Sequence, residues 1–106
     1  MPAPSATVDR PALGWWVAIL GGLGLNAVVA FVPAAYDAWC RHVTAALPAG
    51  LLQLVFVGGL VTHVGEALYA RALARRAGIP AAGWFWQTLA IGFPSLSLLR
   101  RRTGAG

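Results

Sequence analysis

A histidine and a glutamate stand three residues apart in an otherwise apolar stretch, at His63 and Glu66. On a helix, side chains at this spacing lie on one face and can touch. A carboxyl and an imidazole in contact can share a proton, which is the chemistry of a proton relay or of general acid–base catalysis. The same pair can bind a small or lipid-like ligand, or simply fix helix packing through hydrogen bonds. These alternatives stay open at the level of the sequence.

The composition around this pair is that of a membrane protein. The chain has 106 residues, of which 58% are apolar and only 10% charged, too few polar groups to cover a soluble domain. All eight basic residues are arginines. Arginine without lysine, beside much alanine and glycine, indicates a GC-rich genome, so we expect a bacterial cytoplasmic membrane. The arginines cluster beside apolar segments, which favours contact with anionic lipid over nucleic acid.

Three apolar segments predict an all-α protein with three transmembrane helices, at residues 13–35, 50–70 and 81–99. The first is long enough to cross a hydrocarbon core of about 30 Å with some tilt, and the third with almost none. Pro94 predicts a kink in the third span. A cleaved signal peptide, ending near Ala34, is the alternative for the first.

The remaining segments connect or flank these spans. Residues 36–47 have apolar side chains at helical spacing and predict a short interfacial helix, in which Asp37 precedes Arg41 by four residues. Residues 1–12 predict a disordered tail and residues 100–106 a basic one. The single cysteine, Cys40, cannot form an internal disulfide. We expect one membrane domain with no cofactor.

The polar residues of the second and third spans lie at similar predicted depths. Glu66 stands about 9 Å past the middle of its span, and Gln87 about 5–6 Å from the middle of the next, toward the same face. We therefore predict a cluster of His63, Glu66, Gln87 and Thr88, with Tyr69 close by, as the candidate site for a ligand or a proton relay. No second ligand for a metal stands at matching depth, so no metal site is predicted.

Small residues recur every four positions along the first span and predict a ridge that permits close helix approach. The second span carries possible complements. The predicted packing residues are Gly14, Ala18, Gly22, Asn26, Gly58 and Thr62. We expect the ridge to pack within the chain, and a homodimer interface is the alternative.

The orientation is undecided by charge if all three spans cross. Arg10, Arg71, Arg75 and Arg76 then flank one face, and Arg41 with 100–102 the other, which balances the arginines.

Several polar motifs carry a resemblance to a known family. They are His63-Val-Gly-Glu66-Ala-Leu-Tyr69-Ala, a basic turn ending in Gly78, Trp84-Phe-Trp-Gln87-Thr88 and Gly92-Phe-Pro-Ser95-Leu96. Over about residues 60 to 99 the chain resembles the transmembrane protein 254 family. The resemblance implies an all-helical membrane protein, and it implies polar family positions at His63, Glu66, Gln87, Thr88 and Ser95. It implies no activity.

The leading functional hypothesis is a non-enzymatic accessory, scaffold or lipid-binding membrane subunit, working with the bilayer, a membrane partner or a second copy. One alternative is a dual-topology proton-coupled transporter that uses Glu66, motivated by the balanced arginines. Another is an enzyme acting on a lipid-like substrate, although the sequence contains no recognisable nucleophile or cofactor motif.

Overall fold

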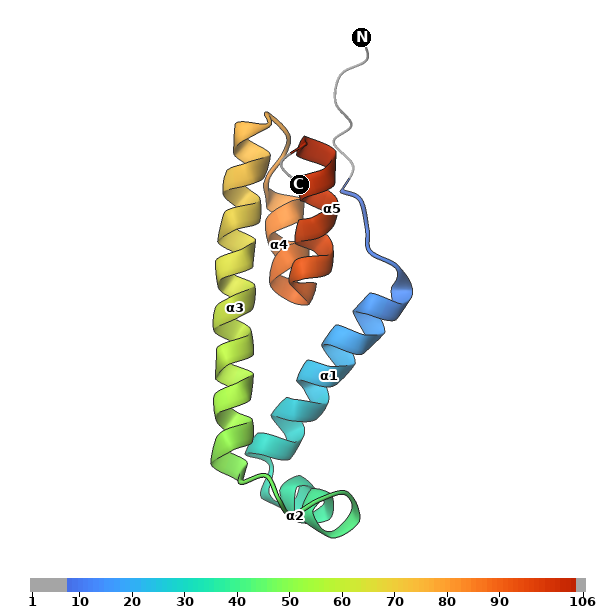
Figure 1. Cartoon of the computed structure of the whole chain (residues 1–106), viewed down its shortest axis with the longest axis vertical. Coiled ribbons are helices and arrows are strands. Elements are labelled where there is room, and N and C mark those ends of the chain that lie inside the picture. The colour runs from blue at the N-terminus through green and yellow to red at the C-terminus, as the bar shows by residue number, and fades with distance from the viewer. Residues whose placement is uncertain (1–7, 105–106) are drawn as a thin grey trace.

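The computed structural model describes residues 8–104, and within them the chain forms five helices and no strand (Figure 1). The helices are α1 (Leu13–Phe31), α2 (Pro33–His42), α3 (Ala49–Arg76), α4 (Ala82–Ile91) and α5 (Phe93–Thr103). The all-helical prediction is confirmed. The predicted disordered tail lies partly outside the described residues, and Val8 and Asp9 near its end contact α4 and α5.

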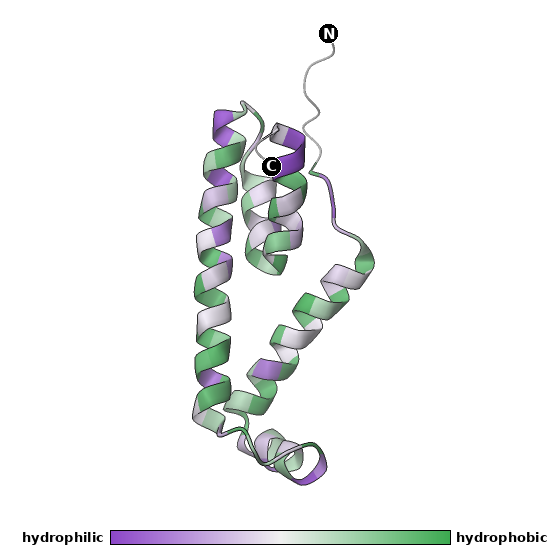
Figure 2. Ribbon diagram, viewed as in Figure 1, coloured by the Kyte–Doolittle hydropathy of each residue, from purple (hydrophilic) through white to green (hydrophobic). Residues whose placement is uncertain are grey.

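Two helices are long and apolar enough to cross a membrane. The 19 residues of α1 and the 28 of α3 extend about 28 and 42 Å. Their apolar side chains point outward: Leu54 and Val61 on α3, for example, are 67% and 66% exposed. Figure 2 shows mostly apolar residues along both helices, with hydrophilic residues at the ends of α3 and α5 and again in α2. A surface of this kind requires cover by lipid or by another protein.

The two long helices pack together only at one end. There the Gln53 side chain donates a hydrogen bond to the Ala30 carbonyl (2.9 Å), and the rings of Phe31 and Phe56 meet edge to face at 5.6 Å. Toward its amino-terminal end, α1 diverges from α3 (Figure 1).

The short helix α2 starts earlier than the predicted interfacial helix, at Pro33, and ends at His42 rather than residue 47. Pro33 cannot continue α1, but its fixed φ suits the first turn of a new helix. The Tyr36 hydroxyl donates a hydrogen bond to the Leu47 carbonyl (2.7 Å). This bond ties α2 to the loop that leads into α3.

The predicted third span is wrong, because the chain reverses at Gly92 instead of kinking at Pro94. Gly92 has φ +71° and ψ −133°, a conformation that residues with a Cβ avoid. Here α4 ends, and α5 begins with Pro94 in its first turn, where a missing N–H costs nothing. With 10 and 11 residues, α4 and α5 extend about 15 and 16 Å, too short to cross a bilayer. They form an antiparallel hairpin beside α3 (Figure 1).

The best-packed part of the molecule lies between this hairpin and α3. Trp84 of α4 and Leu99 of α5 are buried against small residues of α3, including Ala70 and Ala74, both fully buried. Small side chains let the three helices approach closely.

Candidate functional site

The tip of the α4–α5 hairpin meets α3 at the predicted His63/Glu66 pair. His63 Nδ1 lies 2.9 Å from the carbonyl oxygen of Leu89. In a continuous helix this carbonyl would accept a hydrogen bond from residue 93, but α4 ends at Ile91. Because a carbonyl only accepts, His63 donates through Nδ1–H, which leaves Nε2 as an acceptor in the neutral ring. The imidazole therefore caps the end of α4.

Gly92 fits tightly against the same two side chains. A Cβ placed on Gly92 would lie 3.0 Å from His63 Nε2 and 3.2 Å from Glu66 Oε1. The hairpin tip thus touches both members of the pair, and only glycine suits both the backbone angle and the space. Glu66 lies at the positive, amino end of α5, where the helix dipole favours a carboxylate.

Glu66 is only partly buried, and among residues 8–104 it has no hydrogen-bond or ion-pair partner. His63 is also only partly buried. The pair therefore sits at the edge of the helix contact, where the hairpin tip leaves one carboxyl unpaired. In the same described part of the chain, no three potential metal ligands lie together.

Gln87 and Thr88 turn away from Glu66 and bond within the hairpin. The Gln87 amide donates to Ser95 Oγ (3.0 Å) and to the Asp9 carbonyl (2.8 Å), and Thr88 Oγ1 lies 2.9 Å from Ser95 Oγ. All three side chains are buried. Ser95 is the hub, because its hydroxyl accepts a hydrogen bond from Gln87 and shares a second one with Thr88. The predicted four-residue cluster is thus divided in two, since the reversal at Gly92 gives Gln87 and Thr88 a nearer partner on α5.

The remaining predicted residues lie mostly on exposed surface. Tyr69 is 47% exposed, and Gly14, Ala18 and Gly22 face outward. Of the predicted ridge, Asn26 contacts α3, through a hydrogen bond to the Leu52 carbonyl (3.4 Å). Gly58 and Thr62 are exposed, and the Thr62 hydroxyl donates a hydrogen bond to the Gly58 carbonyl. Gly59, one residue further on, packs against Leu23 instead.

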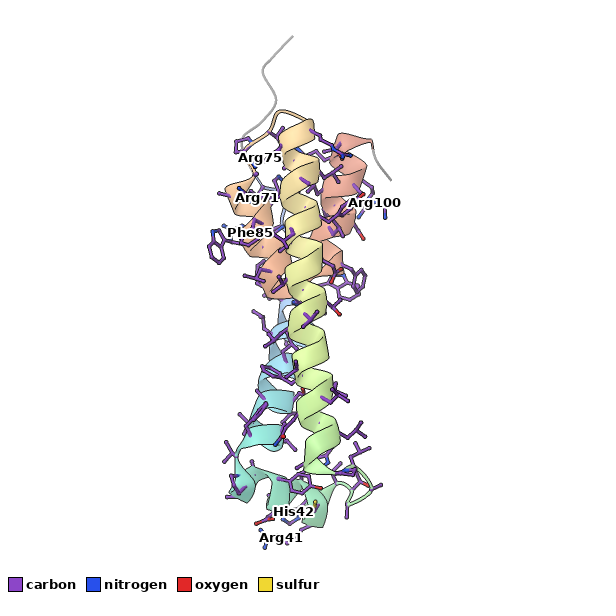
Figure 3. The ribbon with its side chains drawn as sticks, turned by 90° about the vertical axis from the view of Figure 1, so that its left-hand side faces the viewer. Arg41, His42, Arg71, Arg75, Phe85 and Arg100 are labelled. Carbon is purple, nitrogen blue, oxygen red and sulfur yellow. The ribbon has the colours of Figure 1, made fainter. Side chains whose placement is uncertain are left out.

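The arginines form a feature that the sequence analysis missed. By reversing the chain, the hairpin returns residues 100–102 to the end of the molecule that holds Arg71 and Arg75, whereas Arg41 lies at the opposite end (Figure 3). Arg10 belongs to the arginine-rich end as well, because its neighbour Asp9 pairs with Arg102 at 3.8 Å. Seven arginines therefore share one end and one occupies the other. The predicted balance of four against four rested on a third crossing, which the fold lacks.

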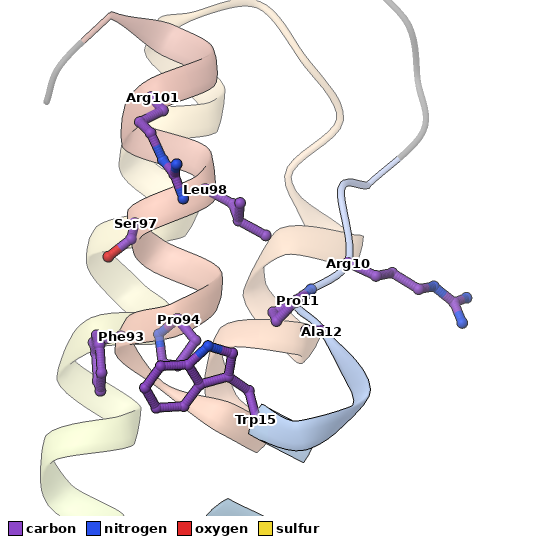
Figure 4. A pocket seen from close by; sticks show the side chains of 9 residues that line it. All are labelled: Arg10, Pro11, Ala12, Trp15, Phe93, Pro94, Ser97, Leu98 and Arg101. Atoms are coloured by element: carbon purple, nitrogen blue, oxygen red, sulfur yellow. The ribbon is translucent and has the colours of Figure 1, made fainter. Parts of the chain in front are cut away.

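Two grooves open at this arginine-rich end. One, of about 340 Å³, lies between the start of α1 and α5, where Trp15 and Phe93 form the apolar side; their rings meet at 5.3 Å. Figure 4 shows Arg101 lying along α5 beside Ser97 and Arg10 directed away. The other, of about 380 Å³, lies between α3 and α4, with Arg71 and Arg75 above Phe85. Both combine guanidinium groups with apolar walls.

Comparison with known proteins gives one match. No curated protein and no solved structure matches the chain. The family model described as Transmembrane protein 254 matches residues 14–101, which includes every motif of the sequence resemblance and also α1 and α2. The match confirms the resemblance, and it confirms that the chain belongs to a membrane protein family. The bacterial origin stays a prediction. The geometry of the hairpin and of the pair at its tip is accordingly that of a member of the Transmembrane protein 254 family, to which this chain belongs.

Proposed function

We propose that the protein is a non-enzymatic membrane subunit that crosses the bilayer twice and binds anionic lipid at its arginine-rich end. The observation that carries this proposal is the return of residues 100–102, through the hairpin, to the end that holds Arg71, Arg75 and Arg76. The chain has three acidic residues in all, and only Asp9 lies at this end. Each exposed arginine near an anionic surface contributes about 1 kcal/mol.

The contacts of α1 support a permanent two-span arrangement. Ala30 and Phe31 contact α3 directly, and cleavage of a signal peptide near Ala34 would remove both contacts. The hairpin then enters the membrane from the arginine-rich side and returns to it. Non-helical backbone at that depth is tolerated where protein covers it, and Gly92 is buried against α3.

The charge distribution favours one orientation, with the arginine-rich end in the cytoplasm, because positively charged flanks stay on that side. A dual-topology transporter loses the balanced arginines that motivated it. An enzyme remains without a nucleophile or cofactor motif to support it.

Tryptophan fluorescence tests the lipid preference. Trp15, Trp16 and Trp86 line the grooves beside Arg10 and Arg101, so lipids with brominated acyl chains that bind there quench their emission. In reconstituted vesicles we expect brominated phosphatidylglycerol to quench more than the same fraction of brominated phosphatidylcholine, and high salt to reduce the difference. A variant with glutamine at residues 100–102 should lose part of the difference. Equal quenching by the two lipids would overturn the proposal.

A further inference from the structure

The groove between α3 and α4 is lined by two arginines. Arg71 and Arg75 stand four residues apart on α3, where their side chains share one face, and both are exposed. Within residues 8–104 neither guanidinium group makes a hydrogen bond or an ion pair. Figure 3 shows both guanidinium-bearing side chains on the side of α3 that carries Phe85 of α4. Like charges at this spacing repel, and an anion bound between them would offset that repulsion.

The first turn of α4 faces the same groove. Ala81 and Ala82 line it, and no side chain caps the helix start. The free N–H groups of a first turn add positive potential. Two guanidinium groups and this helix start therefore surround one space of about 380 Å³.

Below the arginines the groove is apolar. Leu68, Phe85 and Trp86 form its walls, and Leu68 lies about one helical turn deeper than Arg71. Leu68 is 52% exposed and Val64, the next turn down, 45%, so the groove continues into the lipid-facing surface of α3. An ion in solution needs no such wall, whereas a lipid places its phosphate at the arginines and its acyl chain along it.

We propose that this groove is a specific site for the phosphate of one anionic glycerophospholipid, held between Arg71, Arg75 and the start of α4. The proposal rests on the proposed function and names the residues that select the lipid.

The test compares two double variants that lose the same charge. R71Q/R75Q removes the groove arginines, whereas R41Q/R76Q removes the same charge at two arginines that do not line this groove. Native mass spectrometry of the full chain in detergent gives the dissociation constant of the first phosphatidylglycerol bound. We expect R71Q/R75Q to raise it by about thirtyfold, as loss of about 1 kcal/mol per arginine implies, and R41Q/R76Q to raise it much less. R71K/R75K, which keeps the charge, should retain most of the binding.

The outcomes separate the two proposals. If both double variants weaken binding equally, the groove is not a specific site, while the general preference for anionic lipid stands. If the unaltered protein binds phosphatidylcholine as tightly as phosphatidylglycerol, both proposals fail. If inorganic phosphate displaces the lipid at millimolar concentration, the site recognises a free anion and the lipid assignment is overturned. Thermal melting of each variant in detergent controls for folding.

Discussion

The imidazole Nδ1 of His63 lies 2.9 Å from the carbonyl oxygen of Leu89, so α3 supplies the hydrogen bond that α4 lacks at its carboxyl end. A carbonyl left without a partner at membrane depth is costly, and His63 removes that cost.

Replacing His63 with alanine should therefore destabilise the hairpin by about 1–3 kcal/mol, because the Leu89 carbonyl loses its donor. Thermal unfolding in detergent measures the change. His63→Gln is the matched control, since its amide can still donate, and it should lose less. An unaltered melting temperature in the alanine variant would show that the bond contributes nothing.

Gly92→Ala should destabilise the protein by about 1–3 kcal/mol, through its backbone angle alone. The added Cβ also meets His63 Nε2 at 3.0 Å and Glu66 Oε1 at 3.2 Å. Gly58→Ala is the control, because Gly58 is helical and nothing lies within 4 Å of the new Cβ; it should be neutral or stabilising. If the two variants melt alike, the hairpin does not need glycine at its tip.

Ser95→Ala should cost about 1–3 kcal/mol, because it leaves the buried Gln87 and Thr88 side chains without their shared partner. The matched control is Ser97→Ala, two residues further on, where the side chain is exposed. Limited proteolysis of the segment 8–12 offers a second readout, since Gln87 also holds the Asp9 carbonyl. Equal stability of both serine variants would contradict the role of Ser95 as hub.

The orientation can be read with cysteine chemistry. Cys40 is the native cysteine and lies on α2, at the end opposite the arginine-rich one. In sealed vesicles of known sidedness, an impermeant thiol reagent should label Cys40 only from the non-cytoplasmic side. A C40S variant that carries Ala77→Cys, in the turn after α3, should be labelled only from the cytoplasmic side. Labelling of both positions from one side, or of either from both, contradicts the proposed orientation.

Tyr36 predicts a loss of stability in alkali. Its hydrogen bond with the Cys40 side chain, followed by desolvation, raises the pKa of the Tyr36 phenol above its ordinary value of 10.0. A group whose pKa is higher in the folded state contributes stability that is complete below the unfolded pKa and is lost as pH rises through the folded one. The melting temperature should therefore fall above pH 10, and it should fall less in the Tyr36→Phe variant. Ultraviolet titration of a Tyr69→Phe variant isolates the phenol, and a Tyr36 pKa at or below 10.0 would contradict the prediction.

The sequence predicted the helical class and the two long apolar helices, because apolar length is a local signal. It did not predict the reversal at Gly92. An apolar run of nineteen residues with an internal proline fits a kinked span as well as a hairpin, and only packing against α3 decides between them. The same error produced the predicted four-residue cluster and the predicted balance of arginines, because both inferences depended on which way residues 93–103 run.

The alanines of α3 show that the spacing of small residues does not predict which of them form a helix contact. Ala67, Ala70 and Ala74 are fully buried, yet apolar and small residues occur on every face of this helix. Exposed Gly58 and Thr62 looked equally suited to packing. Which small residues form the contact depends on where the hairpin lies, and the sequence of α3 alone does not predict that position.

The reversal at Gly92 also decides which charges must pass through hydrocarbon during insertion. A third crossing would carry Arg100, Arg101 and Arg102 through the bilayer, at about 2.5–3.5 kcal/mol for each charge at the centre. In the proposed orientation, the hairpin keeps them on the side on which the chain is made. The one stretch that must be translocated joins α1 to α3, and there Asp37 offsets Arg41, so the chain inserts by moving almost no net charge.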